Sequence, residues 1–256
     1  MDWHLGAGLA CGLYGVAAGL FVPALIARIP EPDPEDPAAE ESEEDVSPLD
    51  DETQVPRPVE EPKELYVDIA RSPGLRWRAA VATGLTAFAL GAAVGWSPAL
   101  TFLMYLAPVG VALAVVDWRT RLLPTKVIAP SYAVVAALAA LSAWVEGDWS
   151  ALLTAALGWL VAGGTFFLMW FIYPRGMGYG DVRLSGVLGI ALGYLGWSEL
   201  LVGVYAGFIL GGVGGLLLSV LRIVDRKAYP FGPFMLVGAV VGVLTGPYVA
   251  GWYTYP

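Results

Sequence analysis

The sequence predicts an all-α protein that crosses a membrane several times. Hydrophobic residues make up 57% of the 256 residues and charged residues only 14%, which is too apolar a composition for a water-soluble domain. About eight apolar runs approach the ~20 residues that a transmembrane helix needs. The basic residues between these runs support the same fold class, a polytopic membrane protein.

The first apolar run, residues 5–26, is expected to be a retained transmembrane helix. The chain begins Met1-Asp2-Trp3-His4 and Arg28 follows the run, so the basic start of a cleaved signal peptide is lacking. We therefore interpret residues 1–29 as a first transmembrane helix whose N-terminus is outside the cell.

An acidic, proline-rich stretch follows this helix. Residues 31–68 contain 16 of the 23 acidic residues and two of the 14 basic residues, a net charge of −14 against +5 for the rest of the chain. Proline removes helix donors and like charges repel, so residues 30–70 are predicted to form a disordered cytoplasmic linker. Such a segment usually serves as a solvated spacer, and an alternative role is to attract a basic partner.

The rest of the chain, residues 71–256, is expected to form a seven-helix membrane domain. By length and lack of charge, its helices are placed at roughly residues 79–95, 99–116, 127–145, 151–173, 182–197, 200–224 and 234–251. If the loops alternate sides, all 14 Lys and Arg residues lie on one side, and six tryptophans lie at the opposite helix ends. The positive-inside rule makes the basic side cytoplasmic and places both termini outside.

The scarcity of cysteine and histidine excludes several kinds of catalytic site. Cys11 is the only cysteine, so the chain can form neither an internal disulfide nor a CxxC zinc site. His4 is the only histidine and is distant in sequence from the other polar clusters. A Ser-His-Asp or Cys-His catalytic arrangement is therefore disfavoured.

Two aspartates are the strongest candidates for functional side chains. Asp117 follows an apolar run and Asp181 precedes one, so both are expected at the cytoplasmic end of a membrane helix. An acid in this position is often functional. The competing interpretation is that each aspartate forms an interfacial ion pair with a nearby base such as Arg119 or Arg183.

A pair of carboxylates would have a specific chemistry. If the fold brings Asp117 and Asp181 within ~4 Å, their charges repel by roughly 4 kcal/mol at an effective dielectric constant of about 20, so they would share one proton. The ionised member can take a proton from water while the protonated member hydrogen-bonds a scissile carbonyl, as in aspartic proteases.

Asp181 lies in a glycine-rich turn. Gly176, Gly178 and Gly180 lack a Cβ atom, so this turn can adopt positive φ values and lie close to a neighbouring helix or a substrate backbone. The alternative is ordinary glycine packing between membrane helices. A phosphate-binding loop is disfavoured, because no strand pattern precedes the turn and no Lys-Ser/Thr follows it.

The two aspartate segments resemble those of a known family. Gly178-Tyr179-Gly180-Asp181 fits the GxGD signature of the intramembrane aspartyl proteases, and its setting, residues 177–189, resembles that of the type IV prepilin peptidases. Residues 117–124 resemble the first aspartate motif of that family, including the proline seven residues after the aspartate. Residues 230–234, Pro-Phe-Gly-Pro-Phe, are similar to the family's stretch ahead of the last helix.

The resemblance implies an endopeptidase of the bacterial inner membrane that removes the basic leader from prepilins or pseudopilins at the cytoplasmic face. It implies Asp117 and Asp181 as the catalytic pair. The supporting motif positions are Gly178, Gly180, Pro124 and Arg183. The implied partners are the lipid bilayer and a substrate with a basic leader and a hydrophobic helix. The resemblance implies no metal, no organic cofactor and no nucleic acid. The sequence leaves the oligomeric state unknown.

Three positions depart from the family pattern. Arg183 stands where lysine is usual, Pro23 stands where asparagine is usual, and residues 31–78 contain no zinc-binding cysteines. Bifunctional relatives use that first loop to methylate the new pilin N-terminus, so N-methyltransferase activity is not expected here.

Two other classes of protein remain open. One is an ion- or proton-coupled transporter that uses the two aspartates, although a transporter more naturally has acids near mid-membrane and repeated halves. The other is a non-catalytic pilus or secretion assembly protein, which would be favoured if the aspartates were far apart.

Overall fold

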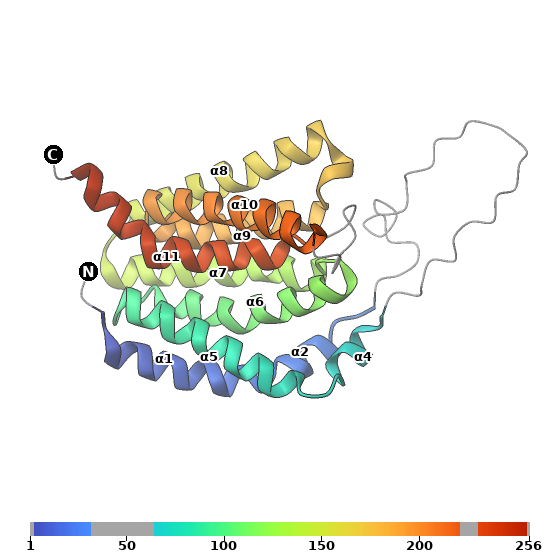
Figure 1. The fold of residues 1–256 in the computed structure, drawn as a ribbon. Coiled ribbons are helices and arrows are strands. Elements are labelled where there is room, and N and C mark those ends of the chain that lie inside the picture. Colours follow the sequence, from blue (N-terminus) through green and yellow to red (C-terminus); the bar gives the residue numbers. More distant parts are fainter. Residues whose placement is uncertain (1–2, 32–63, 221–229, 255–256) are drawn as a thin grey trace, which may run out of the picture.

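The computed structural model describes residues 3–31, 64–220 and 230–254, which form a bundle of helices that lie side by side (Figure 1). No strand occurs in these ranges. The helices in chain order are α1 (Leu5–Gly19), α2 (Val22–Ala27), α4 (Tyr66–Ala70), α5 (Leu75–Val94), α6 (Leu100–Thr120), α7 (Thr125–Glu146), α8 (Ser150–Ile172), the 3-10 turn η1 (Pro174–Gly176), α9 (Tyr179–Leu195), α10 (Trp197–Val220) and α11 (Gly232–Thr254).

The predicted fold class is confirmed. Within the described residues, six helices are long and apolar enough to cross a membrane, namely α5, α6, α7, α8, α10 and α11. The apolar helices α1 and α9 are shorter, with 15 and 17 residues. Each predicted apolar run thus contains a helix, with ends displaced by a few residues, and the chain is a multi-pass membrane protein.

The first apolar run is divided into two helices, which corrects the prediction of one helix over residues 5–26. α1 ends at Gly19 and α2 begins at Val22, with Pro23 in its first turn. Proline has no N–H to donate and is favoured in the first turn of a helix, where that N–H would have no partner within the helix. The proline therefore marks the start of a second helix.

The end of the predicted linker is also folded. Residues 32–63 lie outside the described residues, but α4 occupies the last part of the range 30–70. Tyr66 and Ile69 of α4 are buried in a cluster with Ile26 of α2 and Val116 of α6. Two apolar side chains three residues apart on one helical turn share a face, and this face fixes α4 against the bundle.

An ion pair next to α4 reinforces this contact. The guanidinium of Arg119 donates to both carboxylate oxygens of Glu64, at 2.7 and 2.6 Å, and these hydrogen bonds hold the pKa of Glu64 below its ordinary value. Both side chains are partly exposed, so the pair contributes at most about 1 kcal/mol. The buried apolar contacts, rather than this ion pair, stabilise the position of α4.

The loops that connect the helices lie at the two ends of the bundle. The C-terminal ends of α6 and α8 and the N-terminal ends of α7, α9 and α11 lie together at one end, whereas the first and last described residues lie at the other (Figure 1). Successive loops thus lie at alternate ends of the bundle, which is the assumption behind the predicted placement of all Lys and Arg residues on one side of the membrane.

Glycine allows neighbouring helices to approach closely. α8 and α9 cross where Gly158 faces Gly189, and a Cβ atom added to Gly189 would lie 2.5 Å from the carbonyl oxygen of Gly158. Similar contacts join α1 to α5 through Gly15, and α10 to α11 through Gly238. Close backbone approach is a common way to pack helices in a membrane. The path of α9, and with it Asp181, is therefore set by the backbone of α8.

We predict that Gly158→Ala destabilises the protein by about 1–3 kcal/mol, the usual cost of overpacking. A Cβ atom at Gly158 would overlap the carbonyl oxygen of Gly189, which is backbone and cannot rotate away. Gly164→Ala on the same helix is the matched control, since nothing lies within 4 Å of its Cβ position. Thermal denaturation in detergent micelles measures both, and equal melting temperatures for the two variants would contradict the prediction.

Candidate active site

Asp117 is a buried carboxylate in the last turn of α6, with 4% of its surface exposed. Its Oδ2 atom accepts a hydrogen bond of 3.0 Å from the backbone N–H of Gly232, the first residue of α11. A Cβ atom at Gly232 would lie 2.7 Å from the same oxygen. The start of α11 therefore packs directly on the carboxylate, and only glycine leaves room for it.

α6 ends shortly after Asp117. Arg121 adopts a left-handed conformation, with φ of 58°, and its N–H donates to the carbonyl oxygen of Asp117 at 2.8 Å. Such a conformation closes a helix C-terminus. Pro124 then precedes α7 as its N-cap, and its carbonyl accepts hydrogen bonds from the amides of Val127 and Ile128. Pro124 thus shapes the turn after Asp117.

Asp181 is the second buried carboxylate and occupies the first turn of α9, with 8% of its surface exposed. A helix N-terminus favours a negative charge in its first turn. Within the described part of the chain, the Oδ1 atom of Asp181 is buried and has no hydrogen-bond partner. Buried polar atoms are usually satisfied, so this oxygen is available to a water molecule or to a polar group of a ligand.

The turn between α6 and α7 brings the two aspartates together. A Cβ atom at Gly180 would lie 2.7 Å from the Cβ of Leu123, and one at Gly232 would lie 3.4 Å from its Cδ1. Leu123 therefore packs between the starts of α9 and α11. Asp117, which contacts Gly232, and Asp181, which follows Gly180, thus lie on either side of Leu123. Three segments that are distant in sequence thus form one site.

The glycine-rich turn does not use the positive φ values that its glycines allow, but it does lie close to a neighbouring segment. Gly178 has φ of −68°, and the glycines with positive φ among the described residues are Gly74, Gly95, Gly147 and Gly196. The two glycines of the GxGD signature differ in their surroundings, because the Cβ position of Gly180 is filled by Leu123, whereas the nearest atom to that of Gly178 is 3.7 Å away. Close packing, not backbone conformation, is what requires glycine, and it does so at Gly180.

Arg183 joins α9 to α7 rather than pairing with an aspartate. Its guanidinium donates to the hydroxyl of Thr125 and lies 4.5 Å from the ring centroid of Tyr179. Its carbonyl oxygen accepts a hydrogen bond of 2.7 Å from the hydroxyl of Tyr132. Among the residues that the structure describes, neither Asp117 nor Asp181 takes part in an ion pair. This argues against the interpretation of the aspartates as interfacial ion-pair partners.

Gly232 is a site residue that the sequence did not single out. The segment Pro230-Phe231-Gly232-Pro233-Phe234 stood out as a motif, but its glycine carries no side chain and gives no chemical signal. Its position just before the last helix was the available clue, because amides at a helix N-terminus bind anions. In the described ranges, no group of three or more His, Cys, Asp and Glu side chains is arranged to hold a metal ion.

The fold and the site together define a class: a multi-pass helical membrane protein with a pair of buried carboxylates at one end of the bundle. Residues 104–216, which contain both aspartates, match the type IV leader peptidase family. This central part, less than half of the chain, is similar to that family.

Three relatives are each named "Prepilin leader peptidase/N-methyltransferase". The protein of Aeromonas hydrophila is 31% identical over 184 residues, which are 65% of this chain and 56% of the relative. The Pseudomonas putida protein is 30% identical over 137 residues, 53% and 46% of the two chains, and the Bacillus subtilis protein is 26% identical over 160 residues, 61% and 58%. The chain thus spans about half the length of these relatives. No solved structure matches it.

We predict that the two GxGD glycines tolerate alanine unequally. Gly180→Ala places a methyl group against the Cβ of Leu123, which cannot move without shifting the α6–α7 turn, and is expected to lower the free energy of unfolding by about 1–3 kcal/mol. Gly178→Ala adds a methyl group at ordinary contact distance and serves as the control. The melting temperatures of the two purified variants test this difference in stability. Equal melting temperatures would contradict the prediction and would indicate that both glycines matter only for flexibility.

Proposed function

We propose that the chain is an aspartic endopeptidase that removes the basic leader from type IV prepilins or pseudopilins. The observation that carries this proposal is the juxtaposition of Asp117 and Asp181, both buried and both without an ion-pair partner in the described chain. Their location within the part that matches the type IV leader peptidase family supports it. The relatives named prepilin leader peptidase indicate the class of substrate.

Two neighbouring carboxyl groups in a poorly solvated site can act as the general base and the general acid of peptide hydrolysis. Two negative charges side by side repel, so the pair retains one proton. The ionised carboxylate takes a proton from a water molecule, which attacks the scissile carbonyl carbon, while the protonated carboxyl donates a hydrogen bond to the carbonyl oxygen. The proton then passes to the leaving amine as the C–N bond breaks. The acid and base roles belong to the pair, so we do not assign either role to a particular aspartate.

The hydrogen bond from Gly232 orients one member of the pair. It occupies Oδ2 of Asp117 and leaves the other carboxylate oxygen for water or for the second carboxyl. At Asp181, the buried Oδ1 without a partner offers a second position for a substrate or water. A transporter is less well supported, since both acids lie near helix ends rather than midway along their helices.

We further propose that this end of the bundle faces the cytoplasm of a bacterial cell and that both termini are external. Basic residues near helix ends at the site end include Arg28, Arg119, Lys126 and Arg183, and cytoplasmic connections of membrane proteins carry such an excess. A soluble basic leader would then reach the carboxylates from the cytoplasm.

The proposed activity is proteolysis without methylation. Cys11 is the only cysteine of the sequence, and it is buried in α1 at the contact with Gly91 of α5. No CxxC pair is present that could fix a metal-bound first loop.

We predict that Asp117→Asn and Asp181→Asn each reduce cleavage at least about 100-fold, the usual lower range for loss of a general acid or base. The assay is leader removal from a prepilin-type protein expressed with each variant, followed by mass spectrometry. Asp148→Asn, in the exposed connection between α7 and α8, is the matched control and should cleave normally. Retained processing by either site variant, in protein that inserts and melts normally, would exclude the pair.

We predict that Gly232→Ala lowers cleavage about 10- to 100-fold, because its methyl group displaces the Asp117 carboxylate and a shift of ~1 Å has effects of this size. Gly212→Ala on α10, with nothing within 4 Å of its Cβ position, is the control. Initial rates of peptide cleavage by the purified proteins measure the difference. Wild-type rates for Gly232→Ala would show that this hydrogen bond does not position the carboxylate.

A further inference from the structure

The Gly232 amide reaches the Asp117 carboxylate only if the start of α11 is held in place. Gly232 has no side chain that could anchor it. Its N–H belongs to the first turn of α11, where backbone amides have no partner within the helix, so it is available to the Oδ2 atom of Asp117. The contacts that fix this turn therefore decide where the amide points.

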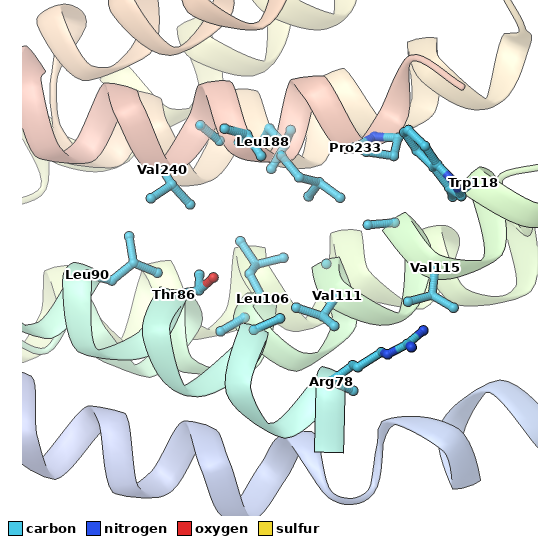
Figure 2. Close-up of a pocket in the computed structure, with 18 of the residues that line it drawn as sticks. Arg78, Thr86, Leu90, Leu106, Val111, Val115, Trp118, Leu188, Pro233 and Val240 are labelled. Atoms are coloured by element: carbon cyan, nitrogen blue, oxygen red, sulfur yellow. The ribbon is translucent and has the colours of Figure 1, made fainter. Parts of the chain in front are cut away.

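One side of this turn borders a pocket of about 520 Å³ between α5, α6, α9 and α11 (Figure 2). Pro233 follows Gly232 and Trp118 follows Asp117, and Figure 2 shows both side chains toward the same end of this pocket. An open pocket offers fewer packing contacts than a filled core. The turn therefore depends more on α8 and α10, whose described residues do not line the pocket.

Phe231, the residue before Gly232, packs into an aromatic cluster formed with α8 and α10. Its ring centroid lies 6.1 Å from that of Phe166 on α8 and 5.7 Å from that of Phe208 on α10. Phe166 and Phe208 stack on each other at 4.9 Å, and Phe166 is buried. Ring pairs at these separations attract each other with a defined geometry. The aromatic cluster of Phe166, Phe208 and Phe231 thus holds the residue before Gly232 against two neighbouring helices.

Phe231 is also joined to the first turn of α11 through its backbone. Its carbonyl oxygen accepts hydrogen bonds from the amides of Phe234 and Met235, at 3.1 and 3.2 Å. Gly232 lies between the acceptor and the donors of these bonds. A displacement of Phe231 would therefore move the Gly232 amide as well.

Glycines of α10 leave room for the phenylalanines on either side of this turn. A Cβ atom at Gly211 would overlap the ring of Phe231, and one at Gly214 would lie 2.6 Å from Cε1 of Phe234. Residues three positions apart share a face of a helix, so both rings pack on the same face of α10. Close packing of this kind leaves the Phe231 ring little room to move.

We propose that Phe231 is a positioning residue, whose ring, held in the aromatic cluster and against Gly211, sets the Gly232 amide on the Asp117 carboxylate. The consequence for cleavage rests on the proposed function. The hydrogen bond is 3.0 Å long, and such bonds weaken steeply when their geometry is distorted. The competing role is that the aromatic cluster only stabilises the packing of α8, α10 and α11. Its loss would then lower stability without slowing the chemical step.

The position of the Gly232 amide can be measured without an activity assay. Phe231–Gly232 is the only Phe-Gly pair in the sequence, so the full chain labelled with carbonyl-¹³C phenylalanine and ¹⁵N glycine gives one resonance in an NMR experiment that correlates each amide with the preceding carbonyl. We expect this amide to exchange with solvent deuterium at least about tenfold faster in Gly211→Ala than in the wild type, because its hydrogen bond is weakened. An unchanged exchange rate in Gly211→Ala would overturn the inference.

Two variants serve as controls for the exchange measurement. Gly212→Ala has nothing within 4 Å of its Cβ position, whereas Gly15→Ala creates a clash with the carbonyl oxygen of Thr83, between α1 and α5. Both should exchange the Gly232 amide at the wild-type rate. Equal acceleration in Gly15→Ala and Gly211→Ala would show a general loss of stability and would also overturn the inference.

Cleavage kinetics provide a second measurement. Phe231→Leu is expected to lower kcat for a prepilin-type peptide about 10- to 100-fold, the effect of a ~1 Å displacement, with KM within about twofold of the wild type. Phe102→Leu is the matched control, since Phe102 is fully buried and packs on Tyr194 at the opposite end of α6. It loses similar ring packing and should keep the wild-type kcat. Equal kcat values for the two variants, measured below both melting temperatures, would overturn the inference.

Combining the substitutions tests whether Gly211 acts through Phe231. Leucine lacks the Cε2 atom that lies nearest to Gly211, so the double variant should be no more than about twofold slower than Phe231→Leu alone. Losses that multiply would overturn the inference. Failure of the wild-type protein to cleave prepilin-type peptides would count against the proposed function, whereas amide exchange at Gly232 would still test the role of the Phe231 ring.

Discussion

The hydrogen bond between the Gly232 amide and the Asp117 carboxylate is the contact on which the site most depends. It joins residues 115 positions apart in sequence and fixes the start of the last helix on the end of α6. A charged or partly charged acid in a low-dielectric region is costly unless hydrogen bonds satisfy it. This amide supplies one such bond without introducing a second charge, so the carboxylate can remain buried and still be reached by water or substrate.

The position of the second carboxylate depends on helix packing rather than on a hydrogen bond. α9 lies against α8 through Gly158 and Gly189, where neither backbone tolerates a side chain on the other. Gly180 continues the same principle at the start of α9, where Leu123 fills the space that a side chain would need. The start of α9, which carries Asp181, is thereby held by a backbone contact with α8 and by the side chain of Leu123. Close backbone contacts leave little freedom for α9 to shift relative to α8.

The two carboxylates lie at one end of the bundle rather than midway along it. They occupy the last turn of α6 and the first turn of α9. Arg119 and Glu64 pair at the same end and connect α6 to the segment before α4. The folded end of the acidic stretch therefore lies beside the turn that carries Asp117.

The sequence by itself determined the helical membrane fold and singled out the two aspartates as candidate site residues. Long apolar runs have few alternatives in a bilayer, because backbone groups there must be satisfied within helices, and an acid at the end of such a run is conspicuous. Only the tertiary structure identified Gly232, the unequal surroundings of Gly178 and Gly180, and the docking of Tyr66. These features arise where segments distant in sequence meet, and they depend on the space between backbones, for which a glycine or an alanine gives no signal in a linear sequence.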